Sequence, residues 1–104
     1  MKKTTHFKHT QSIKSIEIDN ETLAEEIGDL YYDSLSDFLA ALSKKLNADG
    51  DADSARGRKK LATHLHEAAK HLEVASTHID QAWQICAPHV EAWMAEHGSN
   101  RSEE

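Results

Sequence analysis

Histidines recur in the second half of the chain at a spacing that could support metal binding or proton exchange. Six of the eight histidines lie between residues 64 and 97, and His64, His71 and His78 are seven residues apart. This spacing places side chains in a row along one side of a helix. Such a row can bind a transition metal, and beside carboxylates it can make association sensitive to pH near neutrality.

Carboxylates that could face these histidines lie earlier in the chain, at Glu26, Asp29, Asp33 and Asp37. Their steps of three and four residues form an acidic stripe if the segment is helical. If the two segments form a hairpin that turns near residues 51–53, the later carboxylates lie level with His71 and the earlier ones with His78. The candidate ligands for a divalent metal are therefore Glu26, Asp29, Asp33, His71 and His78.

Three interpretations of these residues remain open. Hydrogen bonds between histidines and carboxylates could simply fix the register of two helices, the residues could bind a divalent metal, or they could make association depend on pH. The first is favoured, because the string from His66 to His71 places its histidines five residues apart. The zinc motif His-Glu-x-x-His requires four. We therefore expect no cofactor, with a divalent metal as the alternative.

One short stretch resembles an enzyme family. Residues 25–30, Glu-Glu-Ile-Gly-Asp-Leu, resemble the Glu-x-x-Asp half of the metal-binding motif of the MazG-like all-α nucleotide pyrophosphohydrolases. The resemblance implies that Glu26 and Asp29 bind magnesium in a helical oligomer that cleaves nucleoside triphosphates. The family also has a Glu-x-x-Glu pair on a preceding helix, and no pair with that spacing occurs before Glu26.

The elements that would position these residues are predicted by hydrophobic spacing. Between Leu61 and Trp93, apolar and small residues recur at alternating steps of four and three, the heptad pattern of a helix that packs on other helices. Leucine and aromatic residues follow the same steps between residues 23 and 46. We therefore expect an all-α fold, a long antiparallel helical hairpin with helices at about 20–46 and 54–97.

The segments around this hairpin are expected to be irregular. Residues 1–18 form a polar N-terminal arm with some β-like character, followed by the hairpin over residues 19–97. The stretch 47–57, rich in aspartate and glycine, is predicted to be the turn. Pro88 predicts a kink near residue 88, and residues 98–104 are expected to form a disordered tail.

The apolar face and the unequal helix lengths indicate self-association. The second helix is longer than the first by several turns, so part of its apolar face has no counterpart within the hairpin. Two helices alone also cannot bury a face of this width. We therefore expect a homo-oligomer, most simply a dimer in which two hairpins form a four-helix bundle.

Composition narrows the possible functions. The formal net charge of −6 argues against a nucleic-acid binder, and no apolar run is long enough for a membrane span. A single cysteine fits a reducing compartment, so the sequence predicts a small, soluble, cytoplasmic protein. We expect the protein to act as a non-catalytic interaction or adaptor module that binds other proteins. The alternative is a metal-dependent all-α enzyme or a metal-binding bundle that uses the early carboxylates.

Overall fold

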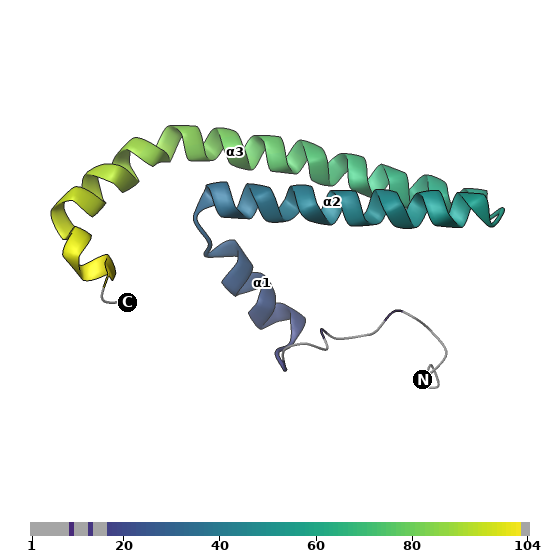
Figure 1. Ribbon diagram of the computed structural model, residues 1–104, viewed down its shortest axis with the longest axis horizontal. Coiled ribbons are helices and arrows are strands. Elements are labelled where there is room, and N and C mark those ends of the chain that lie inside the picture. The colour runs from purple at the N-terminus through teal and green to yellow at the C-terminus, as the bar shows by residue number, and fades with distance from the viewer. Residues whose placement is uncertain (1–8, 10–12, 14–16, 103–104) are drawn as a thin grey trace. The chain divides into compact units, whose positions relative to one another are not determined.

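Helices make up the regular structure of this protein. The computed structural model describes residues 9, 13 and 17–102, with the backbone alone for residues 98–102. Every regular element in that part of the chain is a helix: α1 (Asn20–Gly28), α2 (Tyr32–Ala55) and α3 (Lys59–Ser102) (Figure 1). The prediction of an all-α fold is confirmed. None of these helices contains an apolar stretch long enough to cross a membrane.

The chain divides into two units, Met1–Leu30 and Tyr31–Glu104. In the first unit, the described residues of the predicted arm before α1 belong to no helix or strand, and the rest of the arm lies outside the described residues. Helix α1 begins after Asp19, whose carboxylate accepts a hydrogen bond of 2.8 Å from the backbone N–H of Thr22. This bond satisfies one of the free N–H groups of the first turn.

The prediction of one continuous helix over residues 20–46 is wrong. The structure has two helices there, α1 and α2, and the chain between them is not helical. Tyr31 precedes α2 with an extended backbone (φ −52°, ψ 146°). Its ring stacks on Trp83 of α3, with 5.9 Å between ring centroids and 20° between ring planes. This contact holds Tyr31 outside the helix, and the weak helix propensity of Gly28 and Asp29 lowers the cost of the break.

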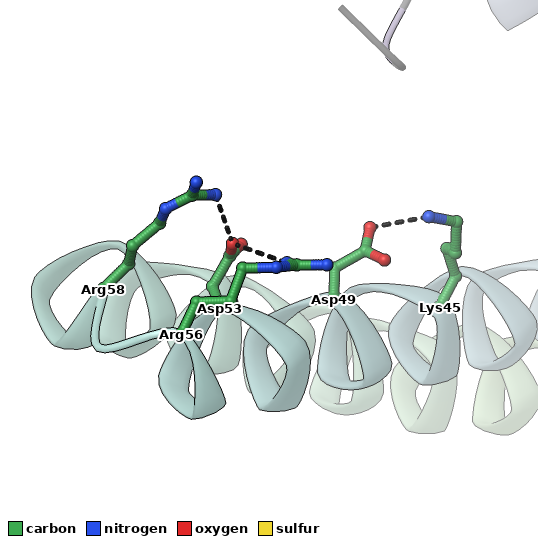
Figure 2. A network of polar contacts seen from close by, with 5 residues as sticks. All are labelled: Lys45, Asp49, Asp53, Arg56 and Arg58. Atoms are coloured by element: carbon green, nitrogen blue, oxygen red, sulfur yellow. Dashed lines mark hydrogen bonds and ion pairs between the residues drawn. The ribbon is translucent and has the colours of Figure 1, made fainter.

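Helix α2 continues to Ala55, through most of the stretch 47–57 that the sequence predicted to be a turn. Packing against α3 favours the helix here, because Gly50 is buried beside the ring of His66. Ion pairs along the helix add about 0.2–0.5 kcal/mol each, since oppositely charged residues three or four apart stabilise helices. Lys45 contacts Asp49 at 2.6 Å, and the carboxylate of Asp53 accepts from Arg56 at 3.4 Å and from Arg58 at 3.2 Å (Figure 2). These pairs offset the weak helix propensity of the aspartates.

The turn itself is short and depends on Gly57. This residue has a φ of 86°, in the left-handed region that side chains disfavour. Its N–H donates to the carbonyl oxygen of Ser54 at 3.0 Å. The N–H of Arg58 donates to the carbonyl oxygen of Asp53 at 2.9 Å. These two bonds form a Schellman motif, which ends α2 and lets α3 begin at Lys59, later than the predicted residue 54.

Helices α2 and α3 pack antiparallel along a line of small residues, called here the contact line. Its members are Ser36, Ser43 and Gly50 on α2, and Ala62, Ala69 and Ser76 on α3, followed by Trp83. The hydroxyl of Ser43 donates to the carbonyl oxygen of Ala69 at 2.7 Å, and Ser36 is bonded in the same way to Ser76 at 2.9 Å. Small side chains at seven-residue spacing therefore let the two backbones approach closely.

Helix α3 continues past the start of α2 (Figure 1). The sequence predicted a kink near residue 88. Inside α3 the backbone leaves helical angles at His97 (φ −122°, ψ 19°), and the C-terminal part of the helix, light green to yellow in Figure 1, curves as a whole. Proline fixes φ near the helical value, so Pro88 removes one backbone bond without leaving the helical path. The predicted tail is also shorter than expected, since α3 reaches Ser102, and residues 103–104 lie outside the described residues.

Candidate interaction surface

Large apolar residues lie along one side of the contact line. On each helix, most of these apolar residues are one or four positions before a contact-line residue in the sequence. Both offsets place a side chain on the same side of the contact line. Because α2 and α3 are antiparallel and face each other, equal offsets on the two helices lead to the same face of the hairpin. We call this the apolar face. Its members are Leu35, Leu39, Leu42 and Leu46 on α2, and Leu61, Leu65, Leu72, Ile79 and Cys86 on α3.

No side chain of the apolar face is buried. Leu61 is 47% exposed and Leu42 is 36% exposed, and the remaining members are half-buried. In the described part of the chain only alanine, serine and glycine residues reach burial. The contact between α2 and α3 thus brings two backbones together without enclosing the large apolar side chains.

The apolar face extends along α3 beyond the reach of α2. Since Ser36 lies level with Ser76, the first residue of α2, Tyr32, lies level with Asp80. Further along α3 the apolar row continues through Cys86 and Val90 to Trp93, which is 48% exposed. The apolar row on α3 is therefore longer than the helix that packs beside it.

The opposite side of the contact line is polar. His66 lies there with its Nε2 atom 3.1 Å from the carboxylate of Asp51. Its ring lies over Gly50, where a Cβ atom would come within 2.6 Å of it. Gly50 belongs to the stretch predicted to be the turn, but it lies inside α2 and leaves room for this ring.

The predicted carboxylate ligands are placed on different elements. Glu26 is exposed on α1, and Asp29 caps that helix through its backbone N–H, which donates to the carbonyl oxygen of Glu25 at 3.0 Å. Asp33 is exposed in the first turn of α2, where its carboxylate accepts from the N–H of Ser34 at 2.7 Å. Asp33 therefore belongs to the hairpin unit, whereas Glu26 and Asp29 belong to the other.

The predicted histidine ligands lie on α3 and are exposed. The side chain of His71 is 78% exposed, and its nearest carboxylate is Glu67 of the same helix, at 3.8 Å. The predicted register is wrong: the serine bonds set His71 level with Ala41 and His78 level with Ser34. The ion pairs of the described residues thus include none between a predicted carboxylate ligand and either histidine.

No three His, Cys, Asp or Glu side chains among the described residues gather closely enough to hold a metal ion. The feature that sequence reasoning missed is the contact line. Its signal was visible, because small residues repeat every seven positions at Ser36, Ser43 and Gly50 and again at Ala62, Ala69 and Ser76. The candidate functional surface is therefore the apolar face beside that line.

Comparison with known proteins gives no family model, no curated protein and no solved structure that the chain matches. The apolar face is therefore the feature that indicates a function.

Proposed function

We propose that this chain is a homodimeric interaction module, in which two hairpins cover each other's apolar faces and form a four-helix bundle. Its role is binding rather than catalysis, and its further partners are other proteins. The observation that supports the proposal is the apolar face, whose large side chains are all half-buried or exposed. Contiguous apolar surfaces of this kind are typical of protein–protein contacts.

The energetics of the hairpin also favour association. Fully burying one leucine or isoleucine contributes about 1.5–3 kcal/mol, whereas ordering each residue costs roughly 1–2 kcal/mol. A contact line of alanine, serine and glycine offers little apolar area to offset that cost. Burial of the apolar face against a second copy would supply the missing contribution, and folding would then be coupled to dimerisation.

Not all exposed apolar residues belong to this face. Val74 is 51% exposed and Ile85 is 75% exposed. Helical geometry places both on the side of α3 that faces away from α2 and from the apolar face. They therefore provide matched controls, because an aspartate there should leave the proposed dimer intact.

The test is the mass of the protein in solution, measured by analytical ultracentrifugation. The wild type should have twice the mass of the 11.6 kDa chain. We expect Leu72→Asp to abolish the dimer, because a charge would enter the buried face. Val74→Asp, only two positions away, should remain a dimer of unchanged helicity. A folded wild-type monomer, or a Leu72→Asp variant that stays dimeric, would contradict the proposal.

The same samples should be analysed for bound metal. A stoichiometric metal that is lost when Asp29 and His71 are changed to alanine would favour the alternative function, a carboxylate–histidine centre. The dimer requires no metal at all. Its mass should therefore be unchanged after treatment with a chelator.

A further inference from the structure

We infer that the two α3 helices of this dimer pack antiparallel across a two-fold axis near Thr77. In this arrangement the large residues of the heptad pattern on one α3 pack against smaller residues of that pattern on the other. This inference rests on the dimer proposed above and adds its register. Since Ser36 lies level with Ser76, an axis at Thr77 falls near the start of α2, so the two α2 helices extend from it toward opposite ends of the α3 pair and all four helices overlap only around the axis. It concerns the part of α3 between Leu61 and Trp93, where the heptad pattern is continuous.

The seam on α3 has two kinds of position. One carries Leu65, Leu72, Ile79, Cys86 and Trp93, and the other carries Leu61, Ala68, Ala75, Ala82 and His89. In an antiparallel pair, positions of the first kind on one helix pack against positions of the second kind on the other. This is because the steps of four and three follow in the opposite order along a helix of reversed direction. Large side chains would then face mainly alanine. A parallel pair would instead place large against large and alanine against alanine.

One register pairs every member of the first set with a member of the second. With the axis at Thr77, a residue lies opposite the one equally far on the other side of that position. The pairs are Leu61 with Trp93, Leu65 with His89, Ala68 with Cys86, Leu72 with Ala82, and Ala75 with Ile79, each residue from a different copy. A shift by one heptad leaves two residues unpaired at each end of the seam.

The length of the apolar row supports the same arrangement. At about 1.5 Å per residue, the row from Leu61 to Trp93 extends roughly 50 Å, whereas α2, with 24 residues, extends roughly 36 Å. A hairpin that covered this row with the α2 of a second copy would leave Val90 and Trp93 beyond its end. A second α3 has the required length, since α3 has 44 residues.

The single cysteine makes the register testable, because Cys86 should lie opposite Ala68 of the second copy. A disulfide needs Cα atoms within about 7 Å. We therefore expect Ala68→Cys to form a covalent dimer when oxidised with diamide, as seen on a non-reducing gel. Positions 68 and 86 of one chain are separated by eighteen residues of helix, roughly 27 Å, so the bond cannot form within a chain.

Two controls use the same chemistry. Ala82→Cys carries its new thiol at the same kind of seam position two heptads further along, and it should not cross-link because it lies opposite Leu72 of the second copy, about 21 Å along the helix from that copy's Cys86. The wild type should not cross-link either, since the two Cys86 residues lie on opposite sides of the axis. Ultracentrifugation of each reduced variant should show the same dimer.

The outcomes separate this inference from the proposed function. A dimer that cross-links through the wild-type Cys86, or through Ala82→Cys in place of Ala68→Cys, overturns the register and leaves the proposed dimer standing. A dimer that cross-links in none of the variants also overturns the register. A protein that is monomeric before oxidation overturns the dimer as well.

Discussion

Ser36 and Ser76 exchange hydrogen bonds across the hairpin. The hydroxyl of each donates to the backbone carbonyl oxygen of the other, both at 2.9 Å. A side chain as short as serine reaches the opposite backbone only when the two helices are close, so these bonds report a close approach of α2 and α3. They also fix the register, because a slip of either helix would break both bonds at once.

The first prediction concerns Ser43, which donates to the carbonyl oxygen of Ala69 at 2.7 Å and is 2% exposed. Ser43→Ala should cost about 0.5–1.5 kcal/mol, because one hydrogen bond is lost without any steric change. Ser43→Val should cost more, up to about 3 kcal/mol in addition, since its branched side chain would force the backbones apart. Urea unfolding at one protein concentration measures both values. Equal costs for the two variants would mean that the helices are not closely packed here.

The heptad pattern identified the helices but not their contact. It predicted Leu65, Leu72 and Ile79 as the seam of the hairpin, whereas α2 packs on the row of Ala62, Ala69 and Ser76 beside them. Hydrophobic spacing marks the middle of an apolar face. The contact line is set by small residues, which carry little hydrophobic signal and lie at the edge of that face.

The predicted pairing of carboxylates and histidines depended on the position of the turn. The structure places the turn at Arg56–Arg58 in place of residues 51–53, and this moves the partner of each α2 residue along α3 by nearly two turns. Aspartate and glycine in 47–55 favour a loop by local propensity. Pairs such as Lys45 with Asp49, and the packing of Gly50 under His66, outweigh that preference.

The second prediction concerns Gly50 and His66. A methyl group at position 50 would lie 2.6 Å from the ring of His66, so Gly50→Ala should displace that ring and separate it from Asp51. In a His66→Ala background the methyl group has space, and we expect Gly50→Ala to stabilise the helix by about 1 kcal/mol. In the wild type the gain should be smaller. A double-mutant cycle by urea unfolding measures the difference, and identical effects in both backgrounds would contradict the close contact.

The third prediction concerns Gly57, whose φ of 86° allows the turn after α2. Gly57→Ala should destabilise the hairpin by roughly 1–2 kcal/mol, because side chains disfavour the left-handed region, and Gly57→Asn should cost less. Gly28→Ala is the matched control. Position 28 has no positive φ and a Cβ there would meet nothing within 4 Å, so this change should not lower the melting temperature.

The last prediction is a pH dependence in α1. Hydrogen bonds from the side chain and the backbone N–H of Thr22 hold the pKa of Asp19 below its ordinary value of 3.8. The folded helix therefore favours the charged carboxylate, and the stabilising effect of this cap is complete above the ordinary pKa. It is lost as the pH falls through the lowered pKa of the folded state, because the protonated group accepts these bonds poorly.

Titration followed by NMR at the carboxyl carbon of Asp19 and the amide of Thr22 measures this effect. Both signals should move with one midpoint below 3.8. Asp19→Asn should keep part of the cap and remove this titration, so the difference between the two proteins isolates Asp19 from the other carboxylates. Asp19→Ala should lower the helicity of α1 at neutral pH as well. A midpoint for Asp19 at or above its ordinary value would show that the cap does not form in solution.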